Sequence, residues 1–242
     1  MKRVLVILLL AVVGFYISET FFDIGFGNSH FVNNEVIKPV KDTYLQQTVQ
    51  ELKVANTVTS IVVNFRGFDT LGEVTVLFLS VTALGSILYK RRHHVGERSV
   101  LFSASSIVTA GSKLLFPAIV LLGTYVFIHG HLSPGGGFQG GVIIATGFLL
   151  MLLAYENYSV SHTNLAIVES LAGVTFAGVG LLGFVYGEQG TFLENFLPSG
   201  VLNDLFSGGV IPIIYIAVGF KVAAELTGVI YTVLNEKGEQ NG

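Results

Sequence analysis

Residues 114–156 read LLFPAIVLLGTYVFIHGHLSPGGGFQGGVIIATGFLLMLLAYE, two apolar runs on either side of a glycine-rich break. A membrane-spanning helix needs about 20 consecutive, largely apolar residues, and each run approaches that length. The composition agrees, because 51% of the 242 residues are hydrophobic and only 12% are charged. Soluble domains carry roughly 25% charged residues. The sequence therefore predicts an integral membrane protein and not a soluble enzyme.

Outward from this stretch, the same criterion predicts an all-α fold, a polytopic transmembrane helical bundle with about six spans. The first apolar run follows a basic start but precedes no small-residue cleavage site, so we interpret it as a retained span. Between the first two spans, apolar residues repeat at helical spacing from Leu45 to Ile61. They predict either an interfacial amphipathic helix leading into Arg66 or a long, bent second span beginning near Asn56. The six predicted spans are residues 3–22, 70–89, 109–128, 138–156, 164–186 and 209–233.

Lys and Arg are distributed unevenly between the loops. The loops after the third and fifth spans contain neither residue, whereas Lys2, Arg3, Lys90, Arg91, Arg92 and Arg98 flank the first two spans. Cytoplasmic loops carry the excess of basic residues, so both termini are predicted to face the cytoplasm. The outer segment with Lys38, Lys41 and Lys53 conflicts with this orientation and receives less weight. A net charge of −3 implies no nucleic-acid partner, and the lack of cysteine excludes disulfides and Cys-ligated metals.

The glycine-rich break, GHLSPGGGFQGG at 130–141, formally matches a dinucleotide-binding fingerprint. That fingerprint requires a preceding strand and a βαβ unit, whereas membrane spans flank this one. We therefore predict a tight outer hairpin between spans three and four, with a direct role in ion passage as the alternative. Two histidines without carboxylates make a poor metal site, and no metal or cofactor is predicted. In the hairpin, Pro134 would stop one helix, Gly135, Gly136 and Gly137 would permit unusual backbone conformations, and Gly140 and Gly141 would allow close helix contact.

A second motif, RGFDTLGE at 66–73, lies at the mouth of the second span. Arg66, Asp69 and Glu73 stand at i, i+3 and i+7, so in a helix they would share one face. Gly67 and Gly72 would loosen the helix there. Two interpretations remain open, namely interfacial charges that reach toward water and groups on an ion path.

Four ionisable residues, Lys113, Glu169, Lys221 and Glu225, lie inside predicted spans. Charges at such depth are costly and usually face the protein interior or a water-filled path. The predicted orientation puts all four in the cytoplasmic half or near the midplane, and we expect one cluster there. Lys221 precedes Glu225 by four residues, the weaker order for an isolated helical pair, so partners on other helices are expected as well. A structural ion-pair network and a proton or cation relay are both consistent with these charges.

The two motifs, RGFDTLGE and GHLSPGGGFQGG, in this order and separated by basic residues, resemble the Mrp-type multisubunit sodium/proton antiporter. The resemblance divides the chain into an N-terminal span with a polar outer segment (1–55), a region similar to the end of the large A subunit (56–98), and a four-span region similar to the B subunit (99–242). Related subunits occur in the membrane arms of membrane-bound hydrogenases and ferredoxin-linked respiratory complexes. The resemblance assigns Arg66, Asp69 and Glu73 to the A-subunit motif, and Lys113, His131, Pro134, Gly135, Gly136, Gly137 and Gly140 to the B-subunit motif.

What this resemblance implies is an accessory subunit that helps form or stabilise the cation/proton translocation path of an antiporter. The alternative is a membrane-arm subunit of a redox-driven, hydrogenase-like ion pump, with a purely structural role. The implied partners are other antiporter-type membrane subunits, hydrogenase-like or ferredoxin-linked redox subunits, lipid, sodium and protons. A stand-alone enzyme or channel is disfavoured, because the sequence offers no nucleophile–base pair and the matching motifs belong to obligate complexes.

Overall fold

The computed structural model describes residues 8, 10–16, 18–19, 31–32, 35–36, 40–89, 104–188 and 190–237. It divides into two units, residues 1–46 and 47–242. In the first unit, residues 10–16 are helical and the two-residue strands β1 (Phe31–Val32) and β2 (Glu35–Val36) pair antiparallel. Half of the predicted first span, 3–22, lies outside the described residues. Helix α2 (Val40–Gln50) leads from the first unit into the second.

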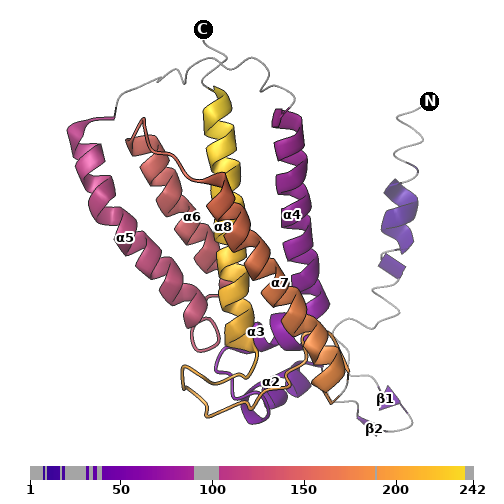
Figure 1. Cartoon of the computed structure of the whole chain (residues 1–242). Coiled ribbons are helices and arrows are strands. Elements are labelled where there is room, and N and C mark those ends of the chain that lie inside the picture. The colour runs from indigo at the N-terminus through magenta and orange to yellow at the C-terminus, as the bar shows by residue number, and fades with distance from the viewer. Residues whose placement is uncertain are drawn as a thin grey trace. The chain divides into compact units, whose positions relative to one another are not determined.

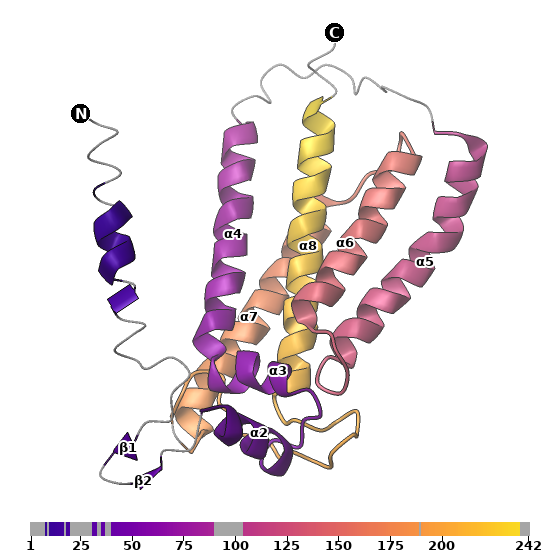
Figure 2. The same cartoon turned by 180° about the vertical axis from the view of Figure 1, so that it is seen from behind.

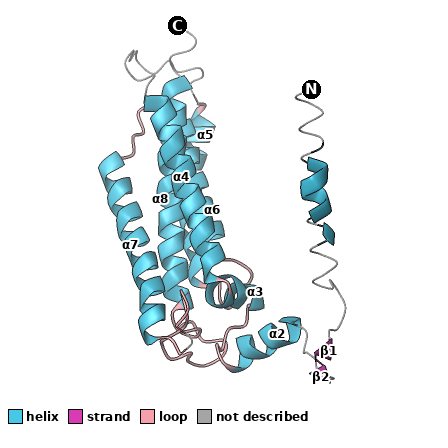
Figure 3. Cartoon of the chain, turned by 90° about the vertical axis from the view of Figure 1, so that its right-hand side faces the viewer, coloured by secondary structure: helices cyan, strands magenta, loops and turns pink. Residues whose placement is uncertain are grey.

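The second unit is a helical bundle, and among its described residues five helices are long and apolar enough to cross a bilayer. They match predicted spans two to six, which confirms the all-α polytopic fold. Helix α8 lies between the others, and Figures 1 and 2 show neighbours on both of its sides. Of the apolar membrane-spanning part of α8, 61% of the residues are buried, against 11% for α4. Figure 3 shows the same helices running alongside one another. The five helices are α4 (Gly67–Tyr89), α5 (Ser106–Ile128), α6 (Gly137–Ala154), α7 (His162–Tyr186) and α8 (Ile211–Lys237).

Glycines bring α6 into close contact with its two neighbours. A Cβ on Gly141 would lie 2.6 Å from the carbonyl oxygen of Gly219 in α8, and one on Gly140 would lie 2.5 Å from that of Gly123 in α5. Small residues let the backbones of membrane helices approach each other in this way. The expectation of close contact at Gly140 and Gly141 is therefore confirmed.

The chain enters α4 through two short helical segments, α3 (Thr57–Ser60) and the π-helical turn η1 (Ile61–Phe65). Asn56 caps α3, its side-chain oxygen accepting the backbone N–H of Val58, and the backbone bends at Arg66 (φ −127°, ψ 41°). Helix α2 ends at Gln50, so no amphipathic helix continues from Leu45 into Arg66. The bent segment beginning near Asn56 is the alternative that matches the structure.

Candidate functional site

Three of the four predicted intramembrane charges lie together. The Lys221 Nζ donates to Glu225 Oε1 at 2.7 Å and lies 3.9 Å from Glu169 Oε1 on the neighbouring helix α7. The exposed fractions of these side chains are 10% for Lys221, 0% for Glu225 and 26% for Glu169. Lys221 thus links its own helix to α7. The expectation of a partner on another helix is met by Glu169.

Two residues that sequence reasoning missed complete the surroundings of Lys221. Its Nζ lies 5.2 Å from the ring centroid of Phe78 on α4, within range of a cation–π interaction. Gly173, one turn beyond Glu169, also adjoins the lysine, since a Cβ there would lie 3.8 Å from the Nζ, an ordinary contact distance. The local sequence does not identify either residue as a neighbour of Lys221, since both contacts arise only when α4 and α7 pack on α8.

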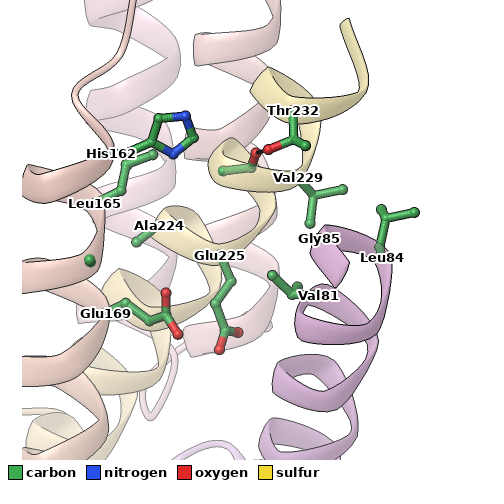
Figure 4. Close-up of a pocket in the computed structure, with 12 residues that line it drawn as sticks. Val81, Leu84, Gly85, His162, Leu165, Glu169, Ala224, Glu225, Val229 and Thr232 are labelled. Atoms are coloured by element: carbon green, nitrogen blue, oxygen red, sulfur yellow. Dashed lines mark hydrogen bonds between the residues drawn. The ribbon is translucent and has the colours of Figure 1, made fainter. Parts of the chain in front are cut away.

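A pocket of about 200 Å³ opens between α4, α7 and α8 and is lined by both glutamates. In Figure 4 the Glu169 and Glu225 carboxylates lie together at one end of the pocket, and His162 and Thr232 lie toward the other. The second oxygen of Glu225, Oε2, has no hydrogen-bond partner among the described residues. A buried polar atom without a partner is costly, and the pocket has room for several waters at about 30 Å³ each. The site can therefore offer a buried carboxylate oxygen to a proton, a water or a small cation.

Lys113 does not belong to this group, so the prediction of one four-residue cluster is wrong for it. Its Nζ lies 5.5 Å above the ring of Tyr155, and within the described ranges it forms no ion pair. The reason is the position of α5, which packs chiefly on α6, whereas Glu169, Lys221 and Glu225 lie where α7 packs on α8 (Figure 2). A similar depth in the membrane does not make two residues neighbours.

The charges of the RGFDTLGE motif lie at the other end of α4. Arg66 pairs with Asp69 at 2.5 Å, but both side chains are more than half exposed, and such pairs contribute about 0–1 kcal/mol. Glu73 is exposed and has no ion-pair partner in the part of the chain that the structure describes. Gly67 does not loosen the helix; it allows a close approach, because a Cβ there would lie 2.8 Å from the Leu193 Cβ.

The hairpin is tight, but for reasons other than those predicted. Helix α5 ends at Ile128, well before Pro134, so the proline does not stop it. Gly136 has φ 163° and ψ 174°, an extended conformation open to any residue, and neither Gly135 nor Gly137 has positive φ. The hairpin glycines are instead close to their neighbours, since a Cβ on Gly137 would lie 2.6 Å from the Tyr215 carbonyl oxygen.

The two hairpin histidines face different neighbours. His131 is completely buried, and the Asp204 carbonyl lies 3.4 Å from its Nε2. Burial lowers the pKa of His131 below its ordinary value, which favours the neutral imidazole. His129 instead stacks on Tyr125, with ring centroids 4.2 Å apart. This arrangement gives His131 a packing role in the hairpin.

Asn56 ties the hairpin to the entrance of α4. Its side-chain amide donates to the carbonyls of Gly130 (2.9 Å) and Ser133 (3.0 Å), while its backbone N–H donates to that of His131 (3.1 Å). Sequence reasoning missed these bonds, although Asn immediately before TVTS is a typical helix N-cap.

Asn56→Ala is expected to lower the free energy of unfolding by about 2–4 kcal/mol, because it removes the cap and the amide that donates to two carbonyls. The Gly130 carbonyl then keeps only the Thr59 hydroxyl as a side-chain donor. Thermal or denaturant unfolding of the purified protein measures the change. Asn164→Ala is the matched control, since Asn164 is exposed on the first turn of α7. Equal stability of the two variants would contradict the assigned role of Asn56.

Five apolar helices around a buried Lys–Glu network define a multi-pass membrane protein that encloses ionisable groups within its spans. A family model described as a domain related to the MnhB subunit of Na⁺/H⁺ antiporters matches residues 107–228, and a second model, MbhE, described as a subunit of MBH, matches residues 22–105. The chain belongs to this MnhB-related family. The resemblance to Mrp-type antiporters and to hydrogenase-type membrane subunits is thereby confirmed.

The similar proteins include an uncharacterized protein and chains of two membrane complexes. An uncharacterized protein of Methanocaldococcus jannaschii is 30% identical over 91% of this chain and 92% of its own length. A chain of the membrane-bound sulfane sulfur reductase, an archaeal respiratory membrane complex, is 42% identical with a TM-score of 0.70, covering 96% of this chain and 98% of that one. A chain of the Mrp complex from Dietzia sp. is 25% identical with a TM-score of 0.66, covering 93% of this chain but only 25% of that one.

Proposed function

We propose that this protein is a membrane subunit of a multisubunit ion-translocating complex, in which Glu225, Lys221 and Glu169 form a site that exchanges a proton or a small cation. The observation that carries the proposal is the buried Glu225 carboxylate beside a pocket. One of its oxygens accepts from Lys221, and the other has no hydrogen-bond partner in the part of the chain that the structure describes. A purely structural ion pair needs neither an oxygen without a hydrogen-bond partner nor a pocket beside it. Carboxylate and hydroxyl oxygens are also the ligands that hard cations prefer.

The pocket opens toward the cytoplasm in this proposal. His162 begins α7 and Thr232 lies near the end of α8, so both belong to the end of the bundle where α4 ends and α5 begins (Figure 1). The chain between α4 and α5 contains Lys90, Arg91, Arg92 and Arg98. An excess of basic residues favours the cytoplasmic side, which supports a cytoplasmic C-terminus.

A redox-driven complex is the second candidate for the assembly. The similarity to the sulfane sulfur reductase chain covers nearly the whole of both chains, whereas this protein spans a quarter of the matched Mrp chain. Full-length correspondence favours a subunit that occupies the same place in a respiratory membrane arm. Sodium and protons remain the proposed transported ions in either assembly.

Purification of the tagged protein in mild detergent tests the assembly. We expect further antiporter-type membrane subunits to co-purify, accompanied by iron–sulfur subunits if the complex is redox-driven. The isolated chain, reconstituted into vesicles, is expected to show no sodium-driven proton flux. Rapid exchange by the isolated chain would contradict the proposed accessory role.

A further inference from the structure

The pocket between α4, α7 and α8 has polar groups at two levels along the helices. Glu225 and Thr232 are seven residues apart on α8, as are His162 and Glu169 on α7, so each pair lies on one face of its helix. Seven residues correspond to about 10 Å of helix rise. Exposure increases along this distance, because Glu225 is buried and His162 is exposed. The pocket therefore connects a buried carboxylate to an exposed histidine.

We propose that this site exchanges protons and not metal cations, and that His162 transfers them between the cytoplasm and Glu225. The inference rests on the function proposed above for Glu225, Lys221 and Glu169, and it names the ion and the residue that delivers it. Histidine is suited to this role, because an imidazole takes up and releases protons near neutral pH. The His162 ring packs edge-on against the Tyr231 ring of α8, with centroids 5.0 Å apart, which holds the imidazole at the pocket.

The charges of the site balance when one proton is bound. Lys221 carries one positive charge and the two glutamates carry two negative charges, so one negative charge remains. A proton taken up at Glu225 Oε2 neutralises that charge on an atom that has no hydrogen-bond partner among the described residues. Lys221 keeps a carboxylate, because its Nζ also lies 3.9 Å from Glu169 Oε1. Uptake of a proton therefore leaves a neutral acid beside a complete ion pair.

A metal cation fits the same site less well. Hard cations such as Ca²⁺ and Mg²⁺ take about six or more oxygen ligands in proteins. The side-chain oxygens that line the pocket belong to Glu169, Glu225 and Thr232. Thr232 lies about 10 Å from Glu225 along α8, and its hydroxyl donates to the Gly228 carbonyl at 2.8 Å. The Lys221 ammonium, 2.7 Å from one Glu225 oxygen, would also repel a cation bound at the other. A proton needs one oxygen, so the proposal assigns sodium to another path in the complex.

Water can carry the proton between the two levels of the pocket. The volume of about 200 Å³ accommodates several waters at about 30 Å³ each, and about three waters in a hydrogen-bonded row span 10 Å. A hydronium ion from the cytoplasm protonates one ring nitrogen, and the imidazolium releases a proton from the other nitrogen to the first water. The proton then passes along the waters to Glu225 Oε2, and release follows the same steps in reverse. The α4 side of the pocket adds no titratable group, because Val81, Leu84 and Gly85 line it.

Reaction of the intact complex with dicyclohexylcarbodiimide tests the identity of the ion. This reagent modifies protonated carboxyl groups in apolar surroundings, and mass spectrometry of the digested protein locates the product. We expect Glu225 to react at the same rate in sodium chloride and in choline chloride, because a site that binds protons alone has no sodium to exclude the reagent. Protection of Glu225 by sodium would overturn the assignment of the proton and leave Glu225 as an exchange site. A Glu225 that stays unmodified at every pH would contradict the proposed function itself.

Proton flux into everted vesicles that carry the intact complex tests delivery by His162. His162→Ala is expected to lower the flux about tenfold without changing assembly, and added imidazole should restore it, because free imidazole can carry protons in the space left by the side chain. A merely structural role would not respond to imidazole. His129→Ala, at the opposite end of the bundle after α5, is the matched control and should keep normal flux with and without imidazole.

The outcomes separate the delivery route from the site that it serves. Normal flux in His162→Ala, or a loss that imidazole does not restore, would overturn delivery by His162 while Glu225 remains essential. Normal flux in Glu225→Gln would instead contradict the proposed function.

Discussion

Complexes carrying Glu225→Gln are expected to assemble in normal yield but to lose at least nine-tenths of their sodium-dependent proton flux. Glutamine has nearly the shape of glutamate and still offers an oxygen to the Lys221 Nζ, which lies 2.7 Å from Oε1 in the wild type. It cannot take up and release a proton, and it brings no negative charge to a cation. Flux into everted membrane vesicles, normalised to the amount of assembled complex, measures the effect.

A structural role for the same pair predicts a different pattern. Removing one partner of a buried ion pair typically costs about 3–5 kcal/mol, so a purely structural Glu225 would be revealed by poor assembly and by surviving complexes that remain active. The double variant Lys221→Gln with Glu225→Gln sharpens the comparison, because it leaves neither charge unpaired on α8. We expect this double variant to assemble and to stay inactive. Glu188→Gln, an exposed residue beyond the end of α7, is the control for loss of one carboxylate. Normal flux in Glu225→Gln would contradict an exchange role for the site.

The features that follow from local sequence were predictable. Runs of apolar residues located the five spans, because hydrocarbon admits long helices whose backbone bonds are all internal. The four-residue spacing of Lys221 and Glu225 indicated their contact within α8, since residues at that interval face each other on a helix. Depth within a span also indicated that Glu169 needed a cationic partner, although it did not say which lysine.

Features that depend on which helices are neighbours were not predictable. Lys113 and Lys221 were equivalent candidates by depth, and only the packing of α5 on α6 separates Lys113 from Glu169. Asn56 contacts the Gly130 carbonyl 74 residues away, and nothing in its local sequence identifies that partner. The glycines of the hairpin suggested unusual dihedral angles, but the structure explains them by close contact between backbones. Unusual dihedral angles and close contact both exclude a side chain, so the sequence does not distinguish them.

Gly141→Val is expected to reduce the yield of folded complex at least tenfold. In the wild type a Cβ at this position would lie 2.6 Å from the Gly219 carbonyl oxygen and 2.8 Å from the Val222 Cβ. The first atom belongs to the backbone of α8 and the second is the branched Cβ of Val222, so no change of side-chain rotamer relieves the clash. Helix α6 must therefore move away from α8, the most buried helix of the bundle. Overpacking of a close contact typically costs about 1–3 kcal/mol, and a second branch at Cβ adds to it.

Helix propensity alone predicts that replacing a helical glycine stabilises the protein, which is the opposite of the effect expected at Gly141. Replacing glycine inside a helix by alanine normally gains about 1 kcal/mol, so open glycines should tolerate or welcome a side chain. A Cβ added to Gly111 on α5 or to Gly178 on α7 would meet nothing within 4 Å, so these two glycines serve as paired controls on different helices. We expect Gly111→Ala and Gly178→Ala to keep normal yield, Gly141→Ala to lose part of it, and Gly141→Val to lose nearly all. Size-exclusion chromatography of detergent-solubilised complex gives the yields, and a Gly141→Val yield equal to that of the controls would show that α6 and α8 do not depend on this contact.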